Sequence, residues 1–117
     1  NIMKIIEDIY VVGGGEYGIG LSCNLDCNVF IIDGGTEIGI IDCGIGFKPE
    51  IIVENIIHER LDIRKITKIF LTHAHLDHSG GTSFLKKRFN SAIYMSDIEA
   101  DFLEGGNEEA IGLKVAN

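Results

Sequence analysis

Short apolar runs separated by turn residues dominate the first third of the chain, and they predict β-strands. Residues 2–12 are rich in β-branched side chains with one acidic break, which indicates two short strands or one bent strand. Residues 29–32 and 37–42 are nearly continuous apolar runs on either side of the Asp-Gly-Gly sequence at 33–35, which is typical of a hairpin turn. Such runs favour a sheet that is covered on at least one face.

The spacing of apolar residues becomes helical over residues 48–62. Pro49 suits the first turn of this helix, and charged side chains mark a wetter face. The residues at helical spacing are Ile51, Ile52, Ile56, Ile57 and Leu61.

Strands and helices alternate in the remainder of the chain. The pattern predicts a short buried strand over residues 68–72, a helix over 79–90 that begins with capping residues, a strand over 92–96, and a helix over 97–105. Asp97 is expected to cap this last helix and Gly105 to stop it. The whole order predicts an α/β fold, in which one sheet of mixed strand pairing carries helices on one face.

Composition narrows the class of protein. A length of 117 residues fits one domain, and 45% hydrophobic residues with a mean hydropathy of +0.20 are sufficient for a packed core. The formal charge of −8 disfavours nucleic-acid or membrane-surface binding, although solubility alone is a simpler explanation of the acidity.

The chain carries no sign of export. No apolar run is long enough for a membrane span, and the first ten residues contain acids where a secretory signal needs an apolar core. Three cysteines are an odd number and do not indicate a disulfide framework. We therefore expect a reducing, cytoplasmic location, and the start at Asn1 suggests a trimmed or partial chain.

The sequence LTHAHLDHSGG, residues 71–81, concentrates the candidate chemistry. His73 and His75 follow the predicted strand at alternate positions, so both rings can reach one point in space. Asp77 and His78 cannot continue that alternation, because the chain must turn at the small residues that follow. We expect a strand end, a tight bend and a helix N-terminus that keeps His78 neutral and able to ligate.

These four side chains suit two divalent metal ions lying side by side, one on the His73/His75 arm and one on the Asp77/His78 arm. Zinc is the default for nitrogen and carboxylate ligands, with iron or manganese as alternatives. Two such ions can bridge a water, lower its pKa and polarise a substrate oxygen. Ordinary hydrogen-bonded histidines, or a catalytic dyad without metal, are the competing interpretations.

The stretch THAHLDHSGG resembles the T-H-x-H-x-D-H-x-G-G signature of the metallo-β-lactamase superfamily, in the form seen in glyoxalase II-like hydrolases. Residues 28–33 and the IIDCG sequence at 40–44 resemble earlier strands of that family. The resemblance implies that His73, His75, Asp77 and His78 bind metal and that Asp42 orients one of the ligands. It also implies half of an αββα sandwich.

The resemblance is incomplete after His78. The family completes its site with a further histidine, a bridging aspartate and a last histidine, but no histidine follows His78, and Asp97 and Asp101 come too early. We therefore expect residues 1–117 to be the N-terminal portion of such a domain, without its C-terminal half. An uncovered apolar sheet face, self-association through it, and weak metal occupancy are the expected consequences.

The resemblance implies a hydrolase that uses a metal-bound hydroxide on a thioester, a lactone or a related ester, with Asp77 holding one metal and orienting the nucleophile. A small-molecule substrate is then the expected partner, with no nucleic acid and no membrane. The alternatives are a nuclease of the same fold, a sulfur dioxygenase with one iron, and an inactive half-domain that only binds a partner. An intact His75 argues against the flavodiiron branch, which has a glutamate there.

Other motifs are weaker. Gly13, Gly15 and Gly18 spell the dinucleotide-binding pattern G-x-G-x-x-G, but no helical spacing follows, so a mobile loop near the site, or a plain turn, is preferred. Cys23 and Cys27 lack the second pair of a zinc ribbon and are expected to be free thiols. The remaining expectations are a core position for Cys43, a solvated His58, and a wet helix face at residues 86–88.

Overall fold

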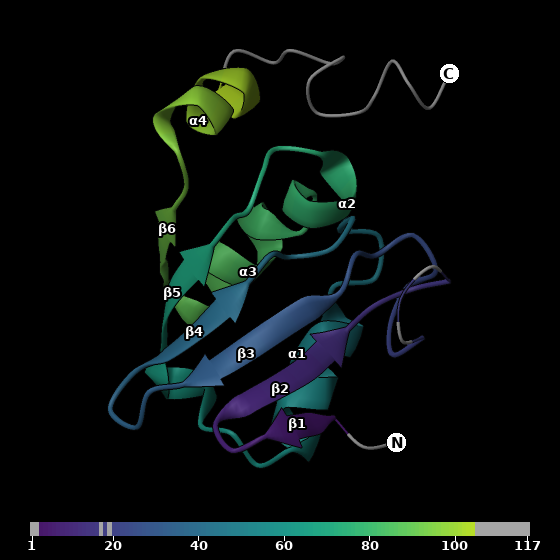
Figure 1. Ribbon diagram of the computed structural model, residues 1–117, viewed down its shortest axis with the longest axis vertical. Coiled ribbons are helices and arrows are strands. Elements are labelled where there is room, and N and C mark those ends of the chain that lie inside the picture. Colours follow the sequence, from purple (N-terminus) through teal and green to yellow (C-terminus); the bar gives the residue numbers. More distant parts are fainter. Residues whose placement is uncertain (1–2, 17, 19, 105–117) are drawn as a thin grey trace.

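The computed structural model describes residues 3–16, 18 and 20–104, and these form one six-stranded sheet with helices (Figure 1). The spatial order of the strands is their order in the chain, β1-β2-β3-β4-β5-β6. The strands are β1 (Lys4–Ile6), β2 (Ile9–Gly13), β3 (Val29–Asp33), β4 (Ile38–Ile41), β5 (Ile66–Phe70) and β6 (Ala92–Tyr94). The helices are α1 (Glu50–His58), α2 (Leu76–Ser79), α3 (Thr82–Phe89) and α4 (Asp97–Glu104), with a 3-10 turn η1 at Ile63–Lys65.

The sheet is mixed, as the pattern predicts. Strands β1 to β4 pair antiparallel, whereas β4, β5 and β6 run parallel. The acidic break near the N-terminus is a turn between two strands, with Asp8 at a φ of 68°. In the β3–β4 hairpin the Gly35 amide donates to the Asp33 carboxylate at 2.9 Å, and Gly35 takes a φ of 88°, which favours glycine.

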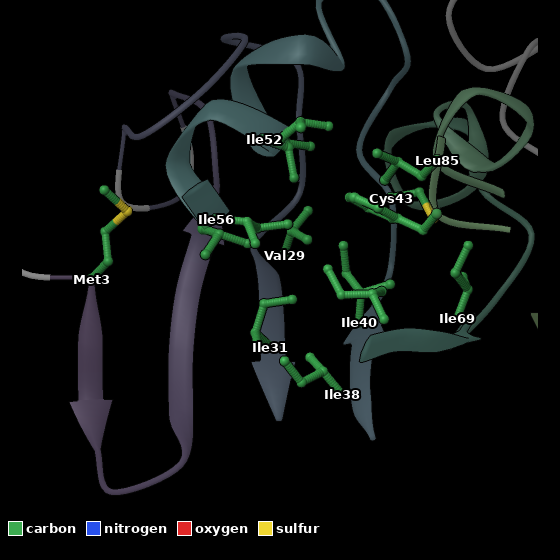
Figure 2. Packing of buried hydrophobic residues seen from close by; sticks show 14 of the residues in the cluster. Met3, Val29, Ile31, Ile38, Ile40, Cys43, Ile52, Ile56, Ile69 and Leu85 are labelled. Atoms are coloured by element: carbon green, nitrogen blue, oxygen red, sulfur yellow. The ribbon is translucent and has the colours of Figure 1, made fainter. Parts of the chain in front are cut away.

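The core lies between one face of the sheet and the two helices α1 and α3. Figure 2 shows Ile52 and Ile56 of α1 beside Val29 and Ile31 of β3, and Leu85 of α3 near Cys43; all of these belong to one buried cluster. Each fully buried aliphatic side chain of this kind contributes about 1.5–3 kcal/mol through removal of its surface from water. The expected core position of Cys43 is therefore confirmed, with 0% of the residue exposed.

Helix boundaries and faces differ from the expectations in three places. On α1, Ile52, Val53 and Ile56 are buried while Ile57 is 51% exposed, because only a narrow stripe of the helix meets the sheet. The helix predicted over 79–90 is α3, which begins only at Thr82; Ser79 is the last residue of a separate helix, α2, and Gly80 and Gly81 lie between the two. The Ser79 hydroxyl caps neither, because it donates to the Ala74 carbonyl at 2.9 Å.

Helix α4 begins at Asp97 but is not capped by it. The Ser96 hydroxyl accepts a hydrogen bond from the Glu99 amide at 3.2 Å, so the residue before the helix is the cap, as its short hydroxyl side chain allows. The predicted stop at Gly105 lies outside the described residues.

The other face of the sheet carries an apolar stripe that no helix covers in the described part of the chain (Figure 1). Phe30, Ile41, Phe70 and Tyr94 are register partners on neighbouring strands, so their side chains form one row across β3 to β6. The rings of Phe70 and Tyr94 stack with centroids 5.4 Å apart, and these residues remain 39% and 46% exposed. We call this row the open-face stripe.

No helix among the described residues is long and apolar enough to cross a membrane.

Candidate metal centre

The site forms where the parallel strands β4 and β5 end. Asp42 directly follows β4, and Thr72 comes two residues after β5, so both lie at the same edge of the sheet. Asp42 adopts a φ of 65°, a conformation that turns the chain away from the strand, and its amide still donates to the Phe70 carbonyl at 2.8 Å. The left-handed residue therefore ends the strand and directs its carboxylate toward the segment that follows β5.

The Asp42 carboxylate is the centre of a buried hydrogen-bond network. It accepts bonds from the Thr72 amide at 2.9 Å, from the Thr72 hydroxyl at 2.8 Å, and from Nδ1 of His78 at 2.8 Å. Only 3% of the residue is exposed. Burial by itself would raise the pKa of Asp42, but the hydrogen bonds from His78 and Thr72 outweigh it and hold that pKa below its usual range.

The structure brings three of the four expected ligands into one group. Three potential ligand atoms lie within 4.8 Å of one another, one each from His73, Asp77 and His78. The rings of His73 and His78 have centroids 4.0 Å apart. The ring of His75 packs edge-on against His73 at 4.8 Å, but His75 is exposed and contributes to none of the three-donor groups found among the described residues. The segment after Phe70 is not a strand, so strict alternation of the two rings is lost.

The electrostatic surroundings of His78 act against the expectation that a helix N-terminus keeps its ring neutral. Burial works to lower the pKa of His78, but the hydrogen bond and charge of Asp42, together with the charge of Asp77, raise it above its usual value. A helix of four residues has too small a dipole to compete with a carboxylate at 2.8 Å. For His73 the pKa is lowered, first by burial and then by the charges of His78 and His75.

Two glycines let the motif turn against the loop that follows β4. A Cβ on Gly80 would overlap the Ile45 carbonyl, and one on Gly81 would overlap the Cys43 carbonyl. The same close approach lets the Cys43 amide donate to the His78 carbonyl at 2.8 Å and the Gly81 amide donate to the Gly44 carbonyl at 3.0 Å. Both positions require glycine because there is no room for a Cβ atom, and any larger residue would push α2 away from Asp42.

The glycine-rich loop lies beside the cluster, and its described residues are held by Asp26, which no sequence pattern singled out. Asp26 is 8% exposed and accepts bonds from the Ser22 hydroxyl at 2.6 Å and the Ile45 amide at 2.8 Å. The next residue, Cys27, donates its amide to the Asp77 carbonyl at 3.1 Å. No helix begins in the described part of this loop, so the dinucleotide-binding pattern lacks its structural context.

Cys27 is a second neighbour of the site that the sequence did not indicate. Its sulfur, an Asp42 oxygen and a His78 nitrogen lie within 4.8 Å of one another. Burial raises the pKa of the Cys27 thiol to about 12, and the charge of Asp42 acts in the same direction. Cys23 and Cys27 are free thiols, as expected.

His58 on α1 and residues 86–88 on α3 are exposed, also as expected.

A pocket of about 600 Å³ opens beside the cluster, between the glycine-rich loop and the open face of the sheet. Its described lining includes three carboxylates and no lysine or arginine. The lining residues are Gly18, Asn24, Leu25, Asp26, Cys27, Asn28, Phe30, Ile41, Asp42, Thr72, Asp77 and His78.

The donor set fits a divalent transition cation. His73, Asp77 and His78 offer two imidazoles and one carboxylate, which is the ligand chemistry that zinc, iron and manganese accept. With Nδ1 of His78 donating to Asp42, the lone pair of this ring is on Nε2, which lies 3.5 Å from an Asp77 oxygen. The residues are therefore arranged to hold such an ion at this edge of the sheet.

Curated relatives of the chain include both hydrolases and ribonucleases. The chain is 30% identical over 103 residues to ribonuclease J 1 of Streptococcus pyogenes, covering 81% of this chain and 18% of that protein. It is 27% identical over 105 residues to the probable metallo-hydrolase YybB of Bacillus subtilis, covering 90% and 44%. Ribonuclease Z of Lactococcus lactis is 39% identical over 71 residues, covering 59% and 22%. The chain thus spans less than half the length of these relatives.

Solved structures and a family model agree with the fold. The metallo-beta-lactamase BJP-1 of Bradyrhizobium japonicum superposes with a TM-score of 0.73 at 27% identity, covering 88% of this chain and 35% of that one. FEZ-1 from Legionella gormanii gives a TM-score of 0.76 at 17% identity, covering 92% and 37%. The model of the metallo-beta-lactamase superfamily matches residues 24–111, most of the chain. The chain belongs to the metallo-beta-lactamase superfamily.

Proposed function

We propose that the chain provides one part of the divalent-metal centre of a hydrolase that acts on a thioester, a lactone or a related ester. The observation that supports this most directly is the Asp42–His78 pair. A buried carboxylate holds Nδ1 of an imidazole whose other nitrogen faces His73 and Asp77. Carboxylates bound in this way to histidine ligands fix the ring and raise its basicity in metal sites.

Each residue then has a distinct task. Asp42 selects the His78 tautomer with its lone pair on Nε2, and Thr72 fixes Asp42 through two hydrogen bonds. His73, Asp77 and His78 would hold the ion, and His75 would remain available to a second ion. A bound divalent ion supplies a water of lowered pKa and a Lewis acid for a carbonyl or phosphoryl oxygen. Zinc is the proposed ion, with iron or manganese as alternatives.

The pocket lining favours an ester over a nucleic acid. Asp26, Asp42 and Asp77 contribute carboxylates, the described lining has no basic side chain, and the chain carries a formal charge of −8. Phosphate backbones need cationic contacts for affinity. An uncharged acyl group next to Phe30 and Ile41 meets no such penalty.

A nuclease is the second candidate, because two of the relatives named above are ribonucleases, at 30% and 39% identity. The nuclease candidate requires basic groups from outside the described lining residues. A sulfur dioxygenase would differ from both candidates in binding a single iron.

Metal analysis and turnover with three substrates test these alternatives. The chain is stripped with a chelator and reloaded with zinc, manganese or iron to measure metal uptake. Turnover of S-lactoylglutathione, a lactone and a phosphodiester is assayed in a protein that carries this part of the centre together with the rest of it. We expect ester hydrolysis with zinc, and we expect His73→Ala to abolish it together with metal uptake. His58→Ala is the matched control, since His58 is exposed on α1. Phosphodiester turnover without ester turnover would favour the nuclease, and equal metal uptake in His73→Ala would reject the site.

Self-association through the open-face stripe is a further part of the proposal. The stripe is continuous across four strands, and Ile32 on the same sheet is 42% exposed. Apolar patches of this kind mark interfaces. Sedimentation at micromolar concentration tests it: we expect dimers or larger species that Phe70→Ser disperses, whereas a monodisperse monomer would contradict the proposal.

A further inference from the structure

We propose that Cys27, Asp42 and His78 form a second cation site, specific for thiophilic divalent cations of the cadmium type, whose occupation is incompatible with the first. The three donor atoms lie within 4.8 Å of one another and come from three different segments. Cys27 lies in the loop before β3, Asp42 at the end of β4, and His78 in α2. All three residues line the same pocket, so a hydrated ion has access to them.

The thiol is fixed in place by its backbone. The Cys27 amide donates to the Asp77 carbonyl at 3.1 Å, which ties the loop to the metal motif. The preceding residue, Asp26, is anchored at both carboxylate oxygens, by Ser22 at 2.6 Å and by Ile45 at 2.8 Å. The thiol therefore needs little rearrangement to meet a cation, whereas the 2.8 Å hydrogen bond between Nδ1 of His78 and Asp42 must open to admit it.

The charges of this donor set balance. Binding removes the proton from the Cys27 sulfur, and a divalent ion with one thiolate and one carboxylate gives a neutral buried cluster. Soft ions prefer thiolate ligands, whereas manganese prefers carboxylate and imidazole, so the sulfur determines which ions the site takes.

The two sites compete because they use opposite nitrogens of one ring. Nδ1 of His78 faces Asp42 at 2.8 Å, and Nε2 lies 3.5 Å from Asp77. When a cation takes Nδ1, the ring proton moves to Nε2 through solvent, and the Cys27 proton is released. His78 then has no lone pair for an ion between His73 and Asp77, so a thiophilic cation at Cys27 empties the first centre.

Cadmium titration of the full chain tests the site, with the thiolate-to-metal absorption band in the ultraviolet as the readout. We expect saturation at a single site, and we expect Cys27→Ser to weaken the affinity about 100-fold or more, since loss of even an outer partner costs 10–100-fold. Cys23→Ser is the matched control, a free thiol of the same loop. An unchanged band in Cys27→Ser, or equal loss in Cys23→Ser, would overturn the proposal.

Two further measurements separate this proposal from the hydrolytic one. His73→Ala removes a donor of the first centre only, so it should keep the cadmium band; loss of the band in this variant would show that cadmium binding needs His73 and would contradict a separate second site. With manganese bound first, cadmium should release it at a lower concentration from the wild-type chain than from Cys27→Ser, and equal concentrations would contradict competition. Neither the cadmium titration nor the His73→Ala result depends on ester turnover.

A variant-free measurement covers the case in which Cys27→Ser does not fold. Cadmium should protect Cys27, but not Cys23, from alkylation of the native chain, as read by peptide mass spectrometry. Equal alkylation of Cys27 with and without cadmium would reject the site.

Discussion

The two arms of the metal motif are built differently. On the Asp77/His78 arm, the His78 ring is bonded to a buried carboxylate, and its backbone carbonyl accepts a bond from Cys43 at 2.8 Å. On the His73/His75 arm, His73 contacts the Thr72 hydroxyl at 3.0 Å, and His75 is exposed with no side-chain hydrogen bond among the described residues. One arm is fixed by buried hydrogen bonds, whereas the other is held mainly by ring contacts, of His73 with His78 at 4.0 Å and of His75 with His73 at 4.8 Å.

Because the two arms are built differently, we expect substitutions in them to affect the free energy of unfolding and the metal affinity to different extents. A change to Asp42 or His78 should alter both stability and metal affinity, because the same bonds hold the sheet edge together and orient the ligand. A change on the His73/His75 arm should alter metal affinity alone.

Asp42→Asn should have the largest effect. The amide cannot accept every bond that the carboxylate accepts, so a buried pair is broken, and we expect a loss of about 3 kcal/mol in the free energy of unfolding. Metal affinity should fall about 10–100-fold, because the His78 ring is no longer fixed. Urea unfolding and metal titration measure the two effects.

Asp77→Asn is the control for this pair. The Asp77 side chain is 50% exposed, so its stability effect should stay within about 0.5 kcal/mol while metal uptake falls. A large loss of stability in Asp77→Asn, or none in Asp42→Asn, would contradict the proposal that Asp77 serves mainly to bind metal and that Asp42 serves to hold His78 and the sheet edge in place.

Gly80→Ala should rank second. Its Cβ overlaps the Ile45 carbonyl, and the resulting shift of α2 should cost about 2 kcal/mol and weaken metal binding. Gly20→Ala provides the contrast, since that Cβ meets no atom within 4 Å and only the φ of 77° opposes it, at about 1 kcal/mol. Thermal unfolding compares the two variants, and equal losses would show that the close packing of α2 is unimportant.

The pH dependence of the metal-free chain should be smaller. Since the folded pKa of His78 is raised above 6.5, its contribution to stability is full below pH 6.5 and is lost as the pH rises through the folded value. Asp42 has a lowered pKa, so its contribution is present above pH 3.8 and is lost as the pH falls through the folded value. Chelator-treated protein should therefore gain most from this pair between pH 3.8 and 6.5, and Asp42→Asn should flatten the profile.

His75→Ala should have the smallest effect on folding. The ring is exposed and lacks a hydrogen bond among the described residues, so the free energy of unfolding should change by less than about 0.5 kcal/mol. Binding of a second metal ion should nevertheless be lost. If His75→Ala proves as destabilising as Asp42→Asn, the two arms do not differ as described.

The parts of the fold that depend on local pattern were predictable from the sequence. Apolar runs place β3 and β4, and the change to helical spacing places α1, because these signals span only a few neighbouring residues. The motif itself is local, so His73, Asp77 and His78 could be selected together. Exact ends were less predictable: Ser96 rather than Asp97 caps α4, and the helix expected from residue 79 begins at Thr82.

The features that were missed depend on contacts between distant residues. The protonation of His78 is decided by Asp42, which lies 36 residues away. Asp26 and Cys27 lie in a loop without periodicity, and the conformation of that loop depends on Ile45, 19 residues further along the chain. No local pattern carries that information, so only the three-dimensional structure shows the thiol beside the metal motif.

The order of strands in the sheet also has a kinetic consequence. Strands β1 and β2, and strands β3 and β4, are joined by short turns, so each pair can form on the microsecond scale typical of hairpins, whereas the longer glycine-rich loop joins β2 to β3. Asp42 meets Thr72 across 30 residues, and this contact must wait for the α1 crossover that brings β5 alongside β4. The histidine cluster is therefore among the last parts to assemble during refolding, and an added cation should slow unfolding far more than it accelerates folding.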